Sequence, residues 1–155
     1  MSYDALRRGR HSEPGRIYHV ITATQVRQPL FTDLTLGRIA ISQMKAEQSA
    51  GHVVSLAWVL MPDHLHWLFT LTGKVSLDAM MQRFKGRAAR AINMQRNSRS
   101  MVWQRAYYDH ALRDDEDVQA IARYIVANPL RAGLVRSLGD YPLWDAIWLD
   151  RTLDV

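Results

Sequence analysis

The chain has no cysteine among its 155 residues. It therefore has no disulfide framework, no thiolate zinc site and no cysteine nucleophile. It also has no apolar run of about 18 residues, the length that a membrane-spanning helix needs. The first ten residues lack the hydrophobic stretch of a signal peptide. We therefore expect a cytoplasmic protein without a membrane segment, and a chain of this length fits one domain, residues 1–155.

Acidic residues are scarce in one long stretch. Between Gly73 and Tyr108 the only acid is Asp78. The basic residues of that stretch are Lys74, Arg83, Lys85, Arg87, Arg90, Arg96, Arg99 and Arg105. A basic N-terminal arm, residues 1–15, adds Arg7, Arg8 and Arg10. Together with a net charge of +5, this clustering favours a phosphate backbone as partner, and a solubilising surface is the alternative.

Two histidines lie two residues apart in an otherwise apolar segment. Successive side chains of a strand point to opposite faces, so His64 and His66 share one face while Leu65 lies on the other. Two imidazoles on one face can bind a single divalent ion. A His-x-His pair alone is a weak signal, because such pairs are often only packed or hydrogen-bonded. We interpret the isolated histidines His19 and His52 as structural.

Hydrophobic periodicity predicts strands over 16–24, 53–60 and 64–71, with a fourth around 107–112. It predicts helices over 33–50 and 76–93, and a third that starts at Arg113 or Asp114 and is stopped by Pro129. Residues 136–155 are expected to form an apolar strap. This order indicates an α+β ferredoxin-like sandwich with an antiparallel sheet. Its added C-terminal helix carries Tyr124, and its central strands are the first and the third.

Tyr124 and Asn128 are four residues apart on that last helix, so both are expected on one side of it. Tyrosine can act as a covalent nucleophile on a phosphodiester, provided that a cation withdraws charge from the phosphate. With His64 and His66, the side-chain amide oxygen of Asn128 would complete a three-ligand metal site. Tyr124 would then lie beside the metal.

Other side chains compete for these roles. Tyr107 and Tyr108 are rival nucleophiles, because they also lie in the second half of the chain near a polar segment. Asp63 and His110 are candidates for hydrogen bonds to the metal ligands. Trp103 is interpreted as a packing residue, with base stacking as the alternative.

Three segments together resemble a known family. They are Met61–Phe69 (MPDHLHWLF), Val102–Gln104 (VWQ) and Tyr124–Val135 (YIVANPLRAGLV). Their order and spacing closely resemble those of the REP-associated tyrosine transposases, relatives of the single-tyrosine HUH transposases of bacterial insertion sequences. The resemblance runs from about residue 16 to 144.

The resemblance implies a ferredoxin-like HUH nuclease domain that cuts and rejoins single-stranded DNA with Mg2+ or Mn2+. His64 and His66 match the metal-binding histidines, and Tyr124 matches the nucleophile. Asn128 matches the third ligand, which is glutamine in some relatives. Such enzymes form a 5′-phosphotyrosine link and free a 3′-hydroxyl, acting on hairpins of repetitive extragenic palindromes.

Within this picture, basic side chains are expected to hold the hairpin backbone. The candidates are Arg83, Arg87 and Arg90 in a helical stripe, Lys85 beside them, and Arg7, Arg8 and Arg10 of the arm. Two other functions stay open. One is a catalytically silent hairpin-binding protein, and the other is a metal-dependent hydrolase of small phosphate esters. We expect a monomer, with a homodimer as the alternative.

Overall fold

The computed structural model describes residues 13–148. Five strands form one antiparallel sheet in the order β4-β1-β3-β2-β5. Their bounds are β1 Ile17–Ala23, β2 Val53–Leu60, β3 His64–Leu71, β4 Tyr108–Ala111 and β5 Trp144–Ala146. The helices are α2 Leu34–Ser49, α3 Leu77–Arg96, α4 Val118–Val126 and the short α5 Asn128–Arg131. The ferredoxin-like α+β fold is confirmed, and β1 and β3 lie inside the sheet as predicted.

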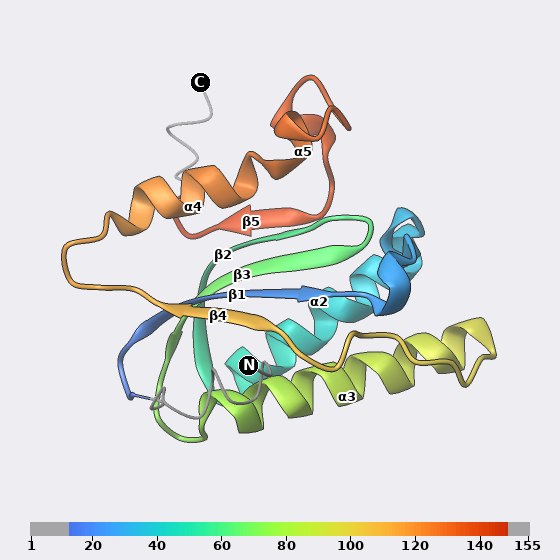
Figure 1. Cartoon of the computed structure of the whole chain (residues 1–155), viewed down its shortest axis with the longest axis horizontal. Coiled ribbons are helices and arrows are strands. Elements are labelled where there is room, and N and C mark those ends of the chain that lie inside the picture. The colour runs from blue at the N-terminus through green and yellow to red at the C-terminus, as the bar shows by residue number, and fades with distance from the viewer. Residues whose placement is uncertain (1–12, 149–155) are drawn as a thin grey trace.

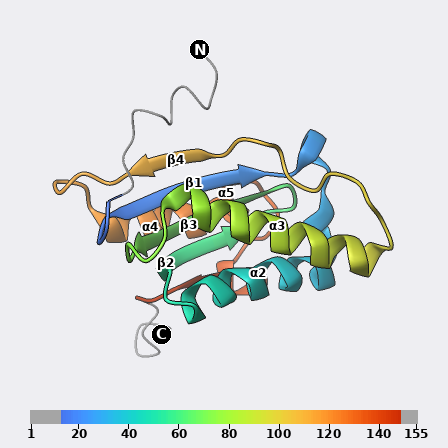
Figure 2. The ribbon, with the colours of Figure 1, turned by 90° about the horizontal axis from the view of Figure 1, so that it is seen from below.

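The helices lie in two layers, one on each side of the sheet. Helices α2 and α3 cover one face, and α4 covers the other (Figures 1 and 2). The larger core lies under α2 and α3, where the Trp67 and Phe84 rings lie 5.4 Å apart. The smaller core lies under α4, where Leu68 packs with Ile125. Neighbouring residues of β3 therefore contribute to different cores, which explains its nearly continuous apolar sequence.

The β2–β3 hairpin has the short Pro62–Asp63 turn that the sequence predicts. Its turn is held by the segment after β1, because the backbone N–H groups of Thr24 and Phe31 donate to the carbonyl oxygens of Asp63 and Pro62. Trp103 forms an isolated bridge with Thr24 and is only 5% exposed. Its packing role is confirmed, and its burial leaves no ring face open for a base.

Helix capping explains where two helices begin. The Asp33 carboxylate accepts from the N–H groups of Thr35 and Leu36, and the Ser76 hydroxyl accepts from that of Ala79. Helix α3 runs three residues beyond the predicted end, to Arg96.

The predicted start of α4 is wrong. The helix begins at Val118 with Asp117 as its cap, so Arg113 and Asp114 precede it. The side chain of Glu116 explains the delay, because it accepts from the Arg113 N–H at 2.8 Å and lies 2.9 Å from His110 Nε2. These contacts hold the chain in a turn after β4.

The C-terminal segment contains a strand that the sequence analysis did not predict. β5 pairs with β2 at the sheet edge, with Ala57 opposite Ala146. The Tyr141 hydroxyl donates to the carbonyl oxygen of Leu60 at 2.5 Å. Residues 149–155 of the predicted strap, and Arg7, Arg8 and Arg10 of the predicted arm, lie outside the described residues. Within residues 13–148, no helix is both long and apolar enough to span a bilayer.

Candidate active site

The histidine pair lies at the start of the central strand β3. His64 and His66 share the sheet face that α4 covers, and their ring centroids are 5.0 Å apart. Both side chains are half-buried between the neighbouring strands. The predicted convergence of the two imidazoles is therefore present.

His64 is oriented by the residue before it. Its Nδ1 atom lies 2.7 Å from the Asp63 carboxylate, whose other oxygen lies 3.6 Å from Arg27 Nε. A carboxylate only accepts, so Nδ1 carries the proton and the Nε2 lone pair is free. No described residue occupies that Nε2 atom. This carboxylate–histidine arrangement is the one commonly seen behind metal ligands.

His66 is oriented by a third histidine, on β1. The Nδ1 atom of His66 lies 3.0 Å from Nε2 of His19, and their rings stack at 5.3 Å. Burial is the main cause that lowers the pKa of His66 to about 3, with smaller contributions from the neighbouring histidines and Arg131. Burial and then the charge of His110 lower the pKa of His19 to about 4. Both rings are therefore neutral at pH 7, the form in which imidazole binds a metal.

His19 was interpreted as structural from the sequence, and its contact with His66 was missed. Alternation along β1 puts His19 on one face with Ile21, but it does not say which strand lies beside it. The register supplies that information, because Ile21 lies directly opposite His66 and His19 opposite Leu68.

Tyr124 lies on α4, with 63% of its surface exposed. The helix packs on the sheet through Ala122 and Ile125, so the tyrosine stays at the edge of that contact. The guanidinium of Arg131 lies over the Tyr124 ring, 3.8 Å from its centroid. Arg131 was not among the residues predicted to form the site.

Asn128 does not continue the helix of Tyr124, contrary to prediction. Helix α4 ends at Val126, and Asn128 opens α5. The side-chain nitrogen of Asn128 donates to the carbonyl oxygen of Ile125 at 2.7 Å. That bond fixes the amide, and its oxygen has no partner among residues 13–148. Pro129 follows in the first turn of α5, where a missing N–H is tolerated.

The rival tyrosines lie on different sides of the sheet. Tyr107 is buried in the larger core, and its hydroxyl donates to Asp78 of α3. It therefore lies away from the histidines. Tyr108 is 48% exposed, and its ring meets His19 edge-on at 6.4 Å. Tyr108 remains a rival to Tyr124 on geometric grounds.

The donor set for a metal ion consists of imidazole and amide groups. Within the described part of the chain, no three histidine, aspartate or glutamate side chains are placed to share an ion. The Nε2 atoms of His64 and His66 and the amide oxygen of Asn128, none of which has a partner in residues 13–148, are nevertheless suitable donors. Two imidazoles with open positions suit several divalent ions, so these residues fit a metal without selecting one.

The predicted DNA-binding stripe lies on α3, on the sheet side opposite the histidines. Arg83 Nε lies 3.3 Å from the buried Glu47 carboxylate of α2. The ammonium of Lys85 donates to the backbone carbonyl of Gln104 at 2.7 Å. Only Arg87 and Arg90 of this group are exposed without a partner in residues 13–148.

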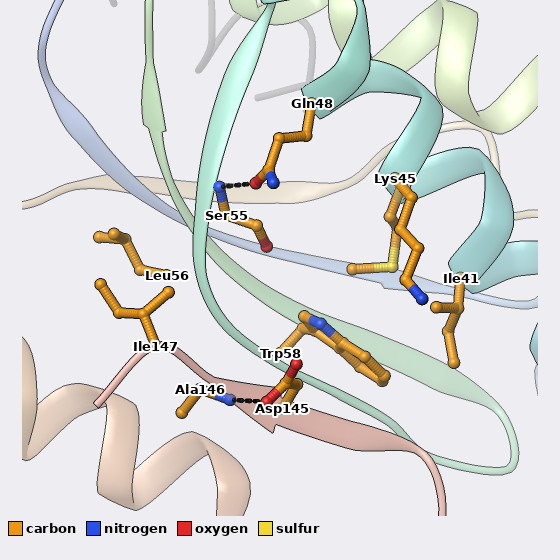
Figure 3. Close-up of a pocket in the computed structure, with 10 residues that line it drawn as sticks. Ile41, Lys45, Gln48, Ser55, Leu56, Trp58, Asp145, Ala146 and Ile147 are labelled. Atoms are coloured by element: carbon orange, nitrogen blue, oxygen red, sulfur yellow. Dashed lines mark hydrogen bonds between the residues drawn. The ribbon is translucent and has the colours of Figure 1, made fainter. Parts of the chain in front are cut away.

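A pocket also lies on that opposite face, between α2, β2 and β5 (Figure 3). Trp58 and Lys45 line it, with Asp145 beside the indole (Figure 3). Trp58 pairs with Trp67, whose side chain points into the larger core, so the pocket is separated from His66 by the sheet. It is not part of the candidate site.

Comparison with known proteins identifies the family and the fold. The family described as "Transposase IS200 like" matches residues 14–128. A REP-associated tyrosine transposase of Escherichia coli strain K12 is 29% identical over 87 residues, covering 56% of this chain and 50% of that protein. The chain thus matches only half of that relative's length. A solved REP-associated tyrosine transposase bound to a REP hairpin has a TM-score of 0.70 at 24% identity, covering 87% of this chain and 79% of the other. At that identity the likeness shows the fold.

Proposed function

Because the chain belongs to the family of IS200-like transposases, we propose that it is a metal-dependent endonuclease and strand transferase of single-stranded DNA. Its substrates are hairpins of repetitive palindromes, and its intermediate is a 5′-phosphotyrosine. One observation carries the proposal. Nε2 of each histidine has no partner in residues 13–148, and both histidines lie on the sheet face covered by the helix of Tyr124. The REP hairpin bound to the solved relative supports the choice of substrate.

The metal-holding groups in this proposal are Nε2 of His64, Nε2 of His66 and the side-chain oxygen of Asn128. Mg2+ or Mn2+ bound there supplies Lewis acidity, which withdraws charge from the phosphate and orients it. Asp63 and His19 hold the two rings through their Nδ1 atoms. Because these contacts at Nδ1 already fix the orientation of both imidazole rings, the two histidine side chains lose little conformational freedom when DNA binds.

Tyr124 performs the covalent step. Its phenol loses a proton, its oxygen attacks the scissile phosphorus, and the bond from phosphorus to the 3′ oxygen breaks. The leaving oxygen takes up a proton and becomes a free 3′-hydroxyl. The tyrosine then carries the 5′-phosphate of the downstream DNA. Attack by another 3′-hydroxyl on this ester reverses the step and joins the strands.

The hairpin backbone requires positive charge, which this chain supplies on several elements. We keep the predicted contacts Arg83, Arg87, Arg90 and Lys85 of α3 and Arg7, Arg8 and Arg10 as part of the proposal. Arg87 and Arg90 are the contacts of this set most available to DNA, since Arg83 and Lys85 have protein partners. The protein acts as a monomer in this proposal.

A gel assay tests the covalent step and its nucleophile together. A hairpin labelled at its 3′ end is mixed with Mn2+ and wild type, Tyr124→Phe or Tyr108→Phe, and run on a denaturing gel. We expect a slow, protease-sensitive band with wild type and Tyr108→Phe only. A band that is lost only in Tyr108→Phe reassigns the nucleophile. No band with several hairpins that bind tightly supports the alternative, a catalytically silent hairpin-binding protein.

A further inference from the structure

The guanidinium of Arg131 contacts the candidate nucleophile Tyr124. The Arg131 guanidinium lies 3.8 Å from the centre of the Tyr124 ring, although seven residues and a break between two helices separate them. Tyr124 is 63% exposed, so the guanidinium covers a ring face that would otherwise be open to solvent. At an exposed position such a contact is weak. It is too weak to hold Arg131 in place once a stronger anionic partner arrives.

Arg131 shares the short helix α5 with Asn128. It follows Asn128 by three residues on α5, so both side chains project from the same side of that turn. Helix α5 begins only one residue after α4 ends (Figure 1). Tyr124, Asn128 and Arg131 thus converge on one region from adjoining helices.

The guanidinium of Arg131 has no carboxylate partner in the described part of the chain. This distinguishes it from Arg27 and Arg83, which lie within 4 Å of Asp63 and Glu47. Arginine presents its N–H donors as a planar fork that matches two oxygens of a phosphate. An unpaired fork beside the candidate nucleophile Tyr124 therefore suits a phosphodiester.

We propose that Arg131 binds the scissile phosphate, holding it between Tyr124 and the two histidines. This role rests on the proposed function. In the DNA-bound state the guanidinium leaves the ring face and donates to the two non-bridging oxygens. It thereby opens the phenol for attack and stabilises the charge that builds up on those oxygens. Both effects come from one side chain that the free protein already holds on the nucleophile.

The first measurement compares rates of covalent adduct formation at saturating hairpin. Arg131→Gln removes the charge, Arg131→Lys keeps a charge without the fork, and Arg123→Gln is the matched control. Arg123 is also exposed, on α4, but lines a groove with Trp144. We expect Arg131→Gln to slow the reaction about 100-fold or more, as for loss of one transition-state donor. Arg131→Lys should stay at least tenfold slower than wild type, and the control should match wild type.

The second measurement needs neither metal nor chemistry. The affinity for two hairpins is measured in EDTA. One hairpin has a normal phosphodiester at the cleavage position, which the covalent adduct identifies, and the other has a neutral methylphosphonate there. Wild type should lose about tenfold in affinity on this change, while Arg131→Gln should bind both DNAs equally, because the interaction exists only when both partners are charged. A residue that merely packs on Tyr124 would give the same loss in both proteins.

The outcomes separate this role from the proposed function. If wild type forms the adduct and Arg131→Gln forms it equally fast, or if the methylphosphonate affects both proteins equally, the assignment of Arg131 is overturned while the tyrosine mechanism stands. Full activity in Arg131→Lys overturns the requirement for a fork. Absence of the adduct in wild type removes the proposed function and this role together.

Discussion

Replacing Arg83 with alanine should destabilise the fold, although Arg83 lies in the stripe assigned to DNA. Glu47 is wholly buried, and its two carboxylate oxygens are held by His52 Nδ1 at 2.9 Å and Arg83 Nε at 3.3 Å. Removing Arg83 leaves one oxygen of a buried carboxylate without a partner. Breaking a buried pair costs about 3–5 kcal/mol. The Arg83 side chain is 45% exposed and His52 remains, so we expect about 2 kcal/mol.

Urea unfolding, followed by tryptophan fluorescence, measures this loss. For a slope of about 2 kcal/mol/M, the midpoint should fall by about 1 M with the slope unchanged. Arg87→Ala is the matched control, one turn along the same helix and exposed, and should stay within about 0.5 kcal/mol of wild type. Adding Glu47→Gln to Arg83→Ala should recover part of the loss. Equal midpoints for Arg83→Ala and Arg87→Ala would refute the reasoning.

In a DNA-binding assay, Arg87→Ala should have the larger effect on the salt dependence of hairpin affinity, and Arg83→Ala the smaller. Each phosphate contact contributes about 0.9 to the slope of log affinity against log salt for a duplex stem. Arg87→Ala should reduce the magnitude of that slope by about one contact. Arg83→Ala should reduce it by less, because Glu47 shares the Arg83 guanidinium. If neither changes the slope, α3 does not contact the hairpin.

Three further predictions concern titration and metal binding. Burial lowers the pKa of His19 to about 4 and of His66 to about 3 in the folded protein. Below pH 6.5 the unfolded chain therefore binds more protons than the folded protein, so the free energy of unfolding should fall by about 2 kcal/mol per histidine between pH 7 and 5. Equal urea midpoints at both pH values would contradict this. Burial raises the pKa of Tyr141 to about 12, so its contribution should be lost as the pH rises from 10 towards 12, and Tyr141→Phe should show a smaller alkaline loss than wild type. Asp63→Ala should weaken Mn2+ binding by about 10- to 100-fold in calorimetry, since His64 loses its orienting carboxylate; an unchanged Kd would show that this contact is unimportant.

Local chemistry explains why much of the fold could be predicted from the sequence. Asp33 and Ser76 each precede an apolar helical stripe, and both cap the helix that follows. The alternation in β3 correctly places Trp67 and His66 on opposite faces, because the side-chain period of a strand does not depend on its neighbours. The order of strands and helices indicated the ferredoxin-like arrangement of these elements, which the structural comparison confirms.

Contacts between distant segments explain what could not be predicted. The His19–His66 contact depends on the register of β1 and β3, which no local pattern contains. The late start of α4 depends on Glu116, which faces His110 of β4. Helical spacing placed the arginines of α3 on the side opposite its apolar residues. Only the packing of α3 on the sheet shows that these arginines lie on the sheet side opposite the histidines. The position of Arg131 over Tyr124 likewise depends on the break between α4 and α5.

The central claim is that Tyr124 becomes linked to the 5′-phosphate of the cleaved DNA, and mass spectrometry of the adduct tests it most directly. The protein is allowed to react with a hairpin and Mn2+, and the adduct is digested with nuclease and trypsin. Cleavage after arginine puts Tyr124 on peptide 124–131, whereas both rival tyrosines lie on peptide 106–113. We predict a phosphonucleotide mass on peptide 124–131 alone. The same mass on peptide 106–113, with 124–131 unmodified, would contradict the assignment of the nucleophile.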